Sequence, residues 1–84
     1  GLVNYALSIQ GIVFAAIIKE TKGAVRLSLR SVGDIPVNVW AREYFSGGGH
    51  KNAAGGISQL TLEETIAQFE NLINIHKDTL HLNP

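Results

Sequence analysis

The segment from Ser46 to Gly56 reads SGGGHKNAAGG, and five of its last ten positions are glycine. Glycine adopts positive φ at no steric cost and lets another group approach the main chain closely. Successive backbone N–H groups of such a run can converge on one anion. His50 and Lys51 add two side-chain donors. The segment therefore predicts a phosphate-binding loop. The alternative is an ordinary surface loop or helix C-terminus, where glycine is also common.

Charge limits the kind of ligand that such a loop can take. The 84-residue chain has seven basic and seven acidic residues, so its formal net charge is zero. A neutral chain lacks the general attraction that dominates binding to long nucleic acids. The basic residues in the half that holds the glycine-rich segment are Arg26, Arg30, Arg42 and Lys51. Acidic residues gather in the C-terminal third. We therefore expect a local site for a small anion.

The sequence offers little for catalysis. Metal-assisted hydrolysis needs several carboxylates and imidazoles in one coordination sphere. The three histidines lack the spacing of metal ligands, and the acidic residues are scattered. Ser46 is not part of a nucleophile motif, and the glycines match neither common nucleotide fingerprint. We expect no catalytic residue and no metal ligand, with His50 donating to a ligand oxygen or to the backbone of the loop. The absence of cysteine is compatible with an intracellular setting.

Two strands are predicted in the first half of the chain. Residues 12–18 (IVFAAII) are apolar and rich in β-branched side chains, which predicts a strand covered on both faces in the middle of a sheet. A turn at residues 20–23 leads into residues 25–30, where apolar and polar residues alternate. This alternation places Arg26, Ser28 and Arg30 on one face. Residues 2–18 include polar interruptions, so they are expected to form core rather than a signal peptide or membrane span.

The second half predicts two helices. Asn38 is expected to cap a short helix with a buried stripe of Trp40, Ala41, Tyr44 and Phe45. Residues 56–58 are expected to form a short strand. Thr61 and Glu64 form a capping box, which predicts a helix from Leu62 to about Lys77, followed by a fraying tail. Together the elements predict a single α+β domain over residues 1–84, with helices packed on a small mixed sheet.

Several of these segments also resemble a known family. The residues that carry the resemblance are Ser28–Ser31 (SLRS), Asn38, Ala41–Arg42, Phe45 and Gly47–Gly56 (GGGHKNAAGG). They are similar to the DHH-associated C-terminal (DHHA) domain of DHH-family phosphoesterases. The resemblance runs from about Gly1 to Ile73. The branch it resembles most includes bacterial oligoribonucleases that also dephosphorylate adenosine 3′,5′-bisphosphate, often labelled exopolyphosphatase-related.

The resemblance implies a substrate-binding role. In this family a separate N-terminal domain carries the DHH motif and manganese, and the C-terminal domain grips the phosphate or terminal nucleotide of the substrate. The positions that match the binding residues are Arg30, Ser31, Gly47, Gly48, Gly49, His50 and Asn52, with Arg42 as a possible helper. The chain is then expected to be part of a longer cytoplasmic enzyme, catalytically silent alone and without a cofactor of its own. Its expected partners are short 5′-phosphorylated oligonucleotides and the DHH domain, with no membrane.

Other roles stay open at this point. An accessory domain of alanyl-tRNA synthetases shares the glycine-rich segment, and the family also contains exopolyphosphatases and single-strand DNA exonucleases. A third alternative is an interdomain or homodimer contact, in which the apolar residues Leu2, Val3 and Tyr5 cover a partner.

Overall fold

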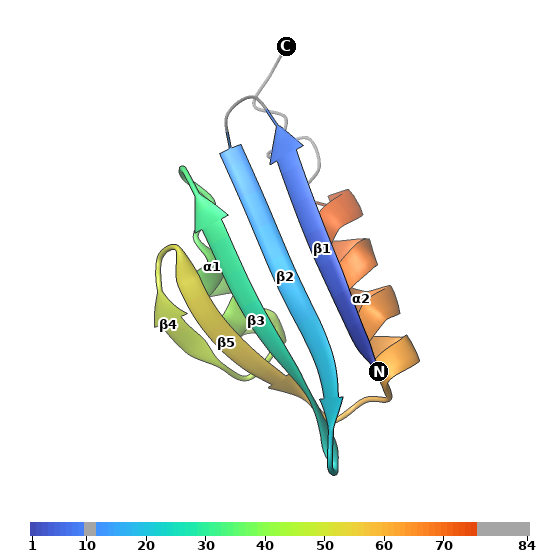
Figure 1. Ribbon diagram of the computed structural model, residues 1–84. Coiled ribbons are helices and arrows are strands. Elements are labelled where there is room, and N and C mark those ends of the chain that lie inside the picture. Colours follow the sequence, from blue (N-terminus) through green and yellow to red (C-terminus); the bar gives the residue numbers. More distant parts are fainter. Residues whose placement is uncertain (10–11, 76–84) are drawn as a thin grey trace.

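The computed structural model describes residues 1–9 and 12–75. Its elements are β1 (Leu2–Ile9), β2 (Ile12–Thr21), β3 (Ala24–Val32), α1 (Val37–Tyr44), β4 (Gly48–His50), β5 (Ala53–Ser58) and α2 (Leu62–Ile75) (Figure 1). The strands form one sheet in the order β1-β2-β3-β5-β4. This confirms the predicted α+β fold. The sheet is not mixed, however, since every described pairing is antiparallel.

The predicted hairpin is formed by β2 and β3, and Gly23 takes a φ of +83° in the tight turn between them. Phe14, Ala16 and Ile18 of β2 are buried. Val13 and Ile17, on the other face of β2, are 41% and 42% exposed. The expectation that this strand is covered on both faces is therefore wrong for the described chain, because both helices pack on the same side of the sheet. An apolar run does not reveal which of its faces the same chain covers.

The strand β1 was not predicted from the sequence, although residues 2–18 were expected to contribute to the core. It pairs with β2 along its whole length. Tyr5 packs on Phe69 of α2, with ring centroids 4.9 Å apart, and its hydroxyl donates to Glu70 at 3.0 Å. Burial, helped by this hydrogen bond, raises the pKa of Tyr5. Tyr5 thus joins β1 to α2.

The helix α1 begins two residues earlier than a cap at Asn38 would place it. Pro36 is the N-cap residue and makes no side-chain capping bond. Asn38 lies inside the first turn, and its Oδ1 is buried without a hydrogen-bond partner, so the predicted capping role is wrong. Trp40, Ala41 and Phe45 are buried as predicted, whereas Tyr44 is 37% exposed.

The start of α2 confirms the predicted capping box. The Thr61 N–H donates to Oε1 of Glu64 at 3.0 Å, and the Glu64 N–H donates to Oγ1 of Thr61 at 3.1 Å. Each residue satisfies a backbone donor that the helix leaves unpaired. The predicted end near Lys77 and the tail lie outside the described residues. Neither described helix has the length and hydropathy that a membrane crossing requires.

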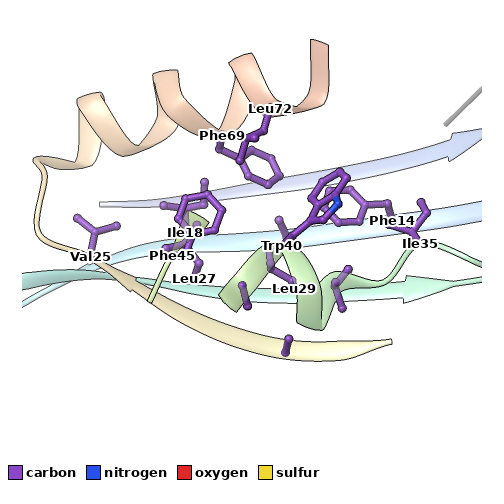
Figure 2. Packing of buried hydrophobic residues seen from close by; sticks show 14 residues of the cluster. Phe14, Ile18, Val25, Leu27, Leu29, Ile35, Trp40, Phe45, Phe69 and Leu72 are labelled. Carbon is purple, nitrogen blue, oxygen red and sulfur yellow. The ribbon is translucent and has the colours of Figure 1, made fainter. Parts of the chain in front are cut away.

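The core lies between the helices and one face of the sheet (Figure 2). Phe14 of β2 contacts Trp40 of α1 at 5.3 Å between ring centroids and Phe69 of α2 at 5.9 Å. The aromatic side chains of both helices therefore meet over the middle of the sheet. The opposite side of the sheet carries no described helix, and we call it the open face.

Candidate anion-binding face

The glycine-rich segment is a β-hairpin, not the loop predicted from the sequence. β4 and β5 pair antiparallel, with His50 opposite Ala53 across the turn at Lys51 and Asn52. The N–H groups of Phe45 and Gly47 both donate to the carbonyl oxygen of Ala41, which closes α1 directly before the hairpin. Successive N–H groups alternate in direction along a strand. They therefore cannot all converge on one anion, as the loop model required.

Three of the glycines are required by the close packing of this hairpin. A Cβ at Gly47 would collide with the carbonyl oxygen of Gly55. A Cβ at Gly49 would lie 2.6 Å from the carbonyl oxygen of Ala53, and one at Gly56 would lie 2.6 Å from Cβ of Phe45. Gly49 also has a φ of +146°. These positions are glycine because the main chain and α1 approach closely there.

Gly48 and Gly55 are different, because the fold leaves room for a side chain at both. A Cβ at Gly48 would meet nothing within 4 Å, and one at Gly55 would make only an ordinary contact with the Leu27 carbonyl oxygen at 3.5 Å. The two residues are direct partners in the β4–β5 pairing. They form a strip of bare main chain on the open face, which we call the glycine strip. The packing of this chain does not require glycine at either position.

The register brings the predicted side chains to the same face. Arg30 lies opposite Ala53 in the β3–β5 pairing, and Ala53 lies opposite His50. Partners in an antiparallel pairing present their side chains on the same face of the sheet. Arg30 and His50 therefore share the open face. In the next row, Ser28 lies opposite Gly55 of the glycine strip.

The charges of this neutral chain are segregated by face. The described charged residues that alternation places on the open face are all basic: Lys19 of β2 and Arg26 and Arg30 of β3. Described acidic residues lie on the helices, in the β3–α1 loop, and at Glu20, which faces the helix side. Arg26 and Arg30 form no ion pair with any described residue. Zero net charge thus conceals a basic sheet face.

Two hollows lie beside these arginines. The Arg30 hollow, of about 230 Å³, is lined by Arg30, Ser31 and Asn52 together with the apolar residues Val13, Ala15 and Val32. The Arg26 hollow is larger, about 350 Å³. Its lining residues are Arg26, Leu27, Ser28, Ser46, Gly47, Gly55, Gly56 and Ile57. The two hollows share no lining residue, so each arginine has its own.

Comparison with known proteins shows the family of the chain. The family model described as the DHHA1 domain matches residues 1–80. This chain belongs to the DHHA1 family. The crystal structure of an exopolyphosphatase-related protein from Bacteroides fragilis is similar to it, with 41% sequence identity and a TM-score of 0.77. That match covers 87% of this chain and 22% of the other. No curated protein matches the chain.

Ser31 and Asn52 of this DHHA1 domain hydrogen-bond to each other. Nδ2 of Asn52 donates to Oγ of Ser31 at 2.8 Å and to the Gly33 carbonyl oxygen at 3.1 Å. Oγ of Ser31, a residue only 8% exposed, donates to the Ile35 carbonyl oxygen at 2.7 Å. We call this network the Ser31–Asn52 clasp. It ties the turn after His50 to the segment after Arg30, so these two residues serve first to hold the site together.

Two basic residues weighed as helpers lie elsewhere in the DHHA1 domain. Nζ of Lys51 contacts Oδ1 of Asp34 at 3.0 Å. Arg42 is exposed on α1, on the helix side of the sheet. Arg42 therefore lies on the opposite side of the sheet from Arg30 and His50, whereas Lys51 forms a surface ion pair in the turn after His50. Among the described residues, no group of three or more His, Cys, Asp or Glu could hold a metal ion.

Arg26 was not predicted to belong to the site, although the alternation of residues 25–30 places it on the same face as Arg30. Its neighbours in the Arg26 hollow come from three separate segments. Only the pairing of β3 with β5 brings Gly55 beside Ser28. The sequence therefore indicated the face on which Arg26 lies, but it did not indicate which residues surround it.

Proposed function

We propose that this DHHA1 domain binds the phosphate groups of a short nucleotide substrate on its open face. It serves as the substrate-binding part of a cytoplasmic, manganese-dependent DHH phosphodiesterase. Its substrates are short 5′-phosphorylated oligonucleotides or adenosine 3′,5′-bisphosphate. The observation that carries the proposal is the segregation of charge, because the described charges on the open face are all basic and two arginines there lack an acidic partner.

The side chains suit this ligand. A guanidinium group such as that of Arg30 can donate two parallel hydrogen bonds to phosphate. The imidazole of His50 can add a donor from the same row of the sheet. The glycine strip beside them lets a ligand lie directly against the main chain. Apolar residues of the Arg30 hollow offer a surface for a ribose or base.

Hydrolysis is assigned to the partner DHH domain. The described residues of this chain offer no cluster of metal ligands, so manganese and the chemistry that it supports belong to that domain in this proposal. The chain spans 22% of the Bacteroides fragilis protein that it resembles. The DHHA1 domain contributes binding and orientation, which hold the scissile phosphate where the partner can act.

The test is an NMR titration of the domain with a 5′-phosphorylated dinucleotide. We expect shifts at Arg30, at His50 and along the glycine strip, and their loss in Arg30→Ala and in His50→Ala. Arg42→Ala is the matched control for Arg30→Ala, since it removes the same charge from the helix side. Shifts that persist in both site variants, or that vanish equally in the control, would contradict the proposal.

The name of the similar structure also points to inorganic polyphosphate as a ligand class. The same titration with linear tripolyphosphate separates the two classes. Tighter binding of the dinucleotide supports a nucleotide substrate. Tighter binding of tripolyphosphate, with no shift in the apolar lining of the Arg30 hollow, would favour an exopolyphosphatase.

A further inference from the structure

We propose that the Arg26 hollow binds a second phosphate of the same ligand, so that the open face takes an extended polyanion rather than one phosphate. This inference rests on the proposed function, which places the first phosphate at Arg30 and His50. It adds the residues Arg26, Ser28 and Ser46 to the binding face.

The spacing of the two arginines separates the two positions. Arg26 and Arg30 are four residues apart on the same face of β3, which sets their Cα atoms about 13 Å apart in an extended strand. β3 is the middle strand of the sheet, between β2 and β5 (Figure 1). Because the two hollows share no lining residue, each arginine can hold its own phosphate.

The composition of the Arg26 hollow suits an anion. It combines the exposed guanidinium group of Arg26 with two hydroxyl groups, those of Ser28 and Ser46. No acidic residue lines it, and Arg26 has no ion-pair partner among the described residues. Lys19 lies opposite Arg26 in the β2–β3 pairing and adds a second positive charge nearby. The polar side chains that line the hollow can all donate hydrogen bonds to a phosphate, and the described charges beside it are positive.

The glycine strip connects the two positions. Gly48 and Gly55 lie in the row of Ser28, between the row of Arg30 and the row of Arg26. The fold has room for a side chain at both, so glycine there is unexplained by packing. A ligand that runs from one arginine to the other must cross this row. A bare main chain lets it pass close to the sheet.

The test is a series of ligands with one, two and three phosphates: a 5′-nucleoside monophosphate and the 5′-phosphorylated di- and trinucleotides. Each is titrated by NMR into the unsubstituted domain, Arg26→Ala, Arg26→Lys and the control Arg42→Ala. We expect Arg26→Ala to leave the Kd of the monophosphate unchanged and to weaken the trinucleotide about tenfold or more, the loss of one charge-assisted hydrogen bond. Arg26→Lys should recover part of that affinity, and Arg42→Ala should match the unsubstituted domain.

The outcomes separate this inference from the proposed function. If none of the three ligands binds the unsubstituted domain, the proposed function is overturned and this inference with it. If the monophosphate binds through Arg30, but Arg26→Ala weakens all three ligands equally or none of them, only the second phosphate position is overturned. A parallel titration with linear polyphosphates of increasing length shows whether the second phosphate must belong to a nucleotide.

Discussion

At the scale of single residues, glycine has two distinct roles within one short hairpin. Gly47, Gly49 and Gly56 make room for backbone and for Phe45, whereas Gly48 and Gly55 leave the open face bare. The two roles cannot be distinguished from the sequence, because all five residues are glycine. The two roles are distinguished by the atoms that a Cβ atom would contact at each position in the folded chain.

This difference predicts opposite effects for adjacent substitutions. Gly47→Ala should lower the unfolding free energy by about 1–3 kcal/mol, because the added methyl group collides with the Gly55 carbonyl group. Gly48→Ala should change stability by less than about 0.5 kcal/mol, because its methyl group points into open space. It should nevertheless weaken ligand binding. Thermal unfolding and titration of both variants check this. A Gly48→Ala protein that binds as before would remove the glycine strip from the site.

The Ser31–Asn52 clasp supports a second prediction. Asn52→Ala removes two hydrogen bonds and should cost about 1–3 kcal/mol of stability, at about 0.5–1.5 kcal/mol for each bond. It should also weaken the ligand, because Arg30 and His50 lose their fixed separation. In an Arg30→Ala background the effect of Asn52→Ala on binding should disappear, whereas its effect on stability should remain. Lys51→Ala, which removes only a surface ion pair of the same turn, is the control. An undiminished binding effect in the Arg30→Ala background would mean that Asn52 contacts the ligand itself.

At the scale of elements, the capping box that predicts the start of α2 lies within four consecutive residues, and both of its hydrogen bonds are formed. Thr61→Ala should destabilise the protein by about 0.5–2 kcal/mol, since it leaves the Glu64 N–H without its partner. Thr61→Ser keeps the hydroxyl group and should lose much less. Chemical denaturation of the two variants measures the difference. Equal losses would show that the methyl group of Thr61, rather than its cap, carries the effect.

The contrast between α2 and the glycine hairpin explains which elements the sequence could predict. A capping box lies within four consecutive residues, and the β2–β3 turn lies between two neighbouring strands. By contrast, β4 has only three residues, two of them glycine, and it joins the sheet through β5, which pairs with β3. The pairing of β5 with β3, which fixes where the hairpin lies in the sheet, joins residues that are distant in the sequence. β1 was overlooked for a related reason, since polar interruptions obscured its alternation.

The same reasoning applies to the site. Arg30 and His50 were found from the sequence because each lies in a recognisable motif, and their contact with a ligand stays a prediction. Ser31 and Asn52 belong to the same motifs, but the structure shows them bonded to each other. A sequence motif indicates which residues occur together, but it does not indicate which of them face the ligand. The row of Ser28, Gly55 and Gly48 could not be found without the strand register.

At the scale of the whole molecule, the segregation of charge revises the expectation drawn from composition. Zero net charge suggested a local anion site and argued against binding to long nucleic acids. The fold instead directs Lys19, Arg26 and Arg30 to one face and gathers most described acidic residues on the helix side. The electrostatic attraction that a ligand experiences near the open face depends on the charges of that face and not on the net charge of the chain.

A salt titration tests this at the same scale. If two phosphates are neutralised on the open face, the logarithm of the trinucleotide binding constant should fall with the logarithm of salt concentration with a slope of about −1.4. Arg26→Ala should reduce the slope to about −0.7, and Arg42→Ala should leave it unchanged. Isothermal titration at several salt concentrations measures these slopes. A slope near zero would exclude phosphate contacts as the basis of binding.

The strand order has a further consequence for how the domain opens. Among the described strands, β4 is an edge strand that pairs only with β5, while β3 lies between β2 and β5. Local opening can therefore detach β4 without disturbing the core, and amide hydrogen exchange should be fastest at Gly48, Gly49 and His50 among the strand residues of the hairpin. A ligand that bridges His50 and Arg30 would fasten this loose edge to the central strand. Slowed exchange at three amides would then report occupancy directly.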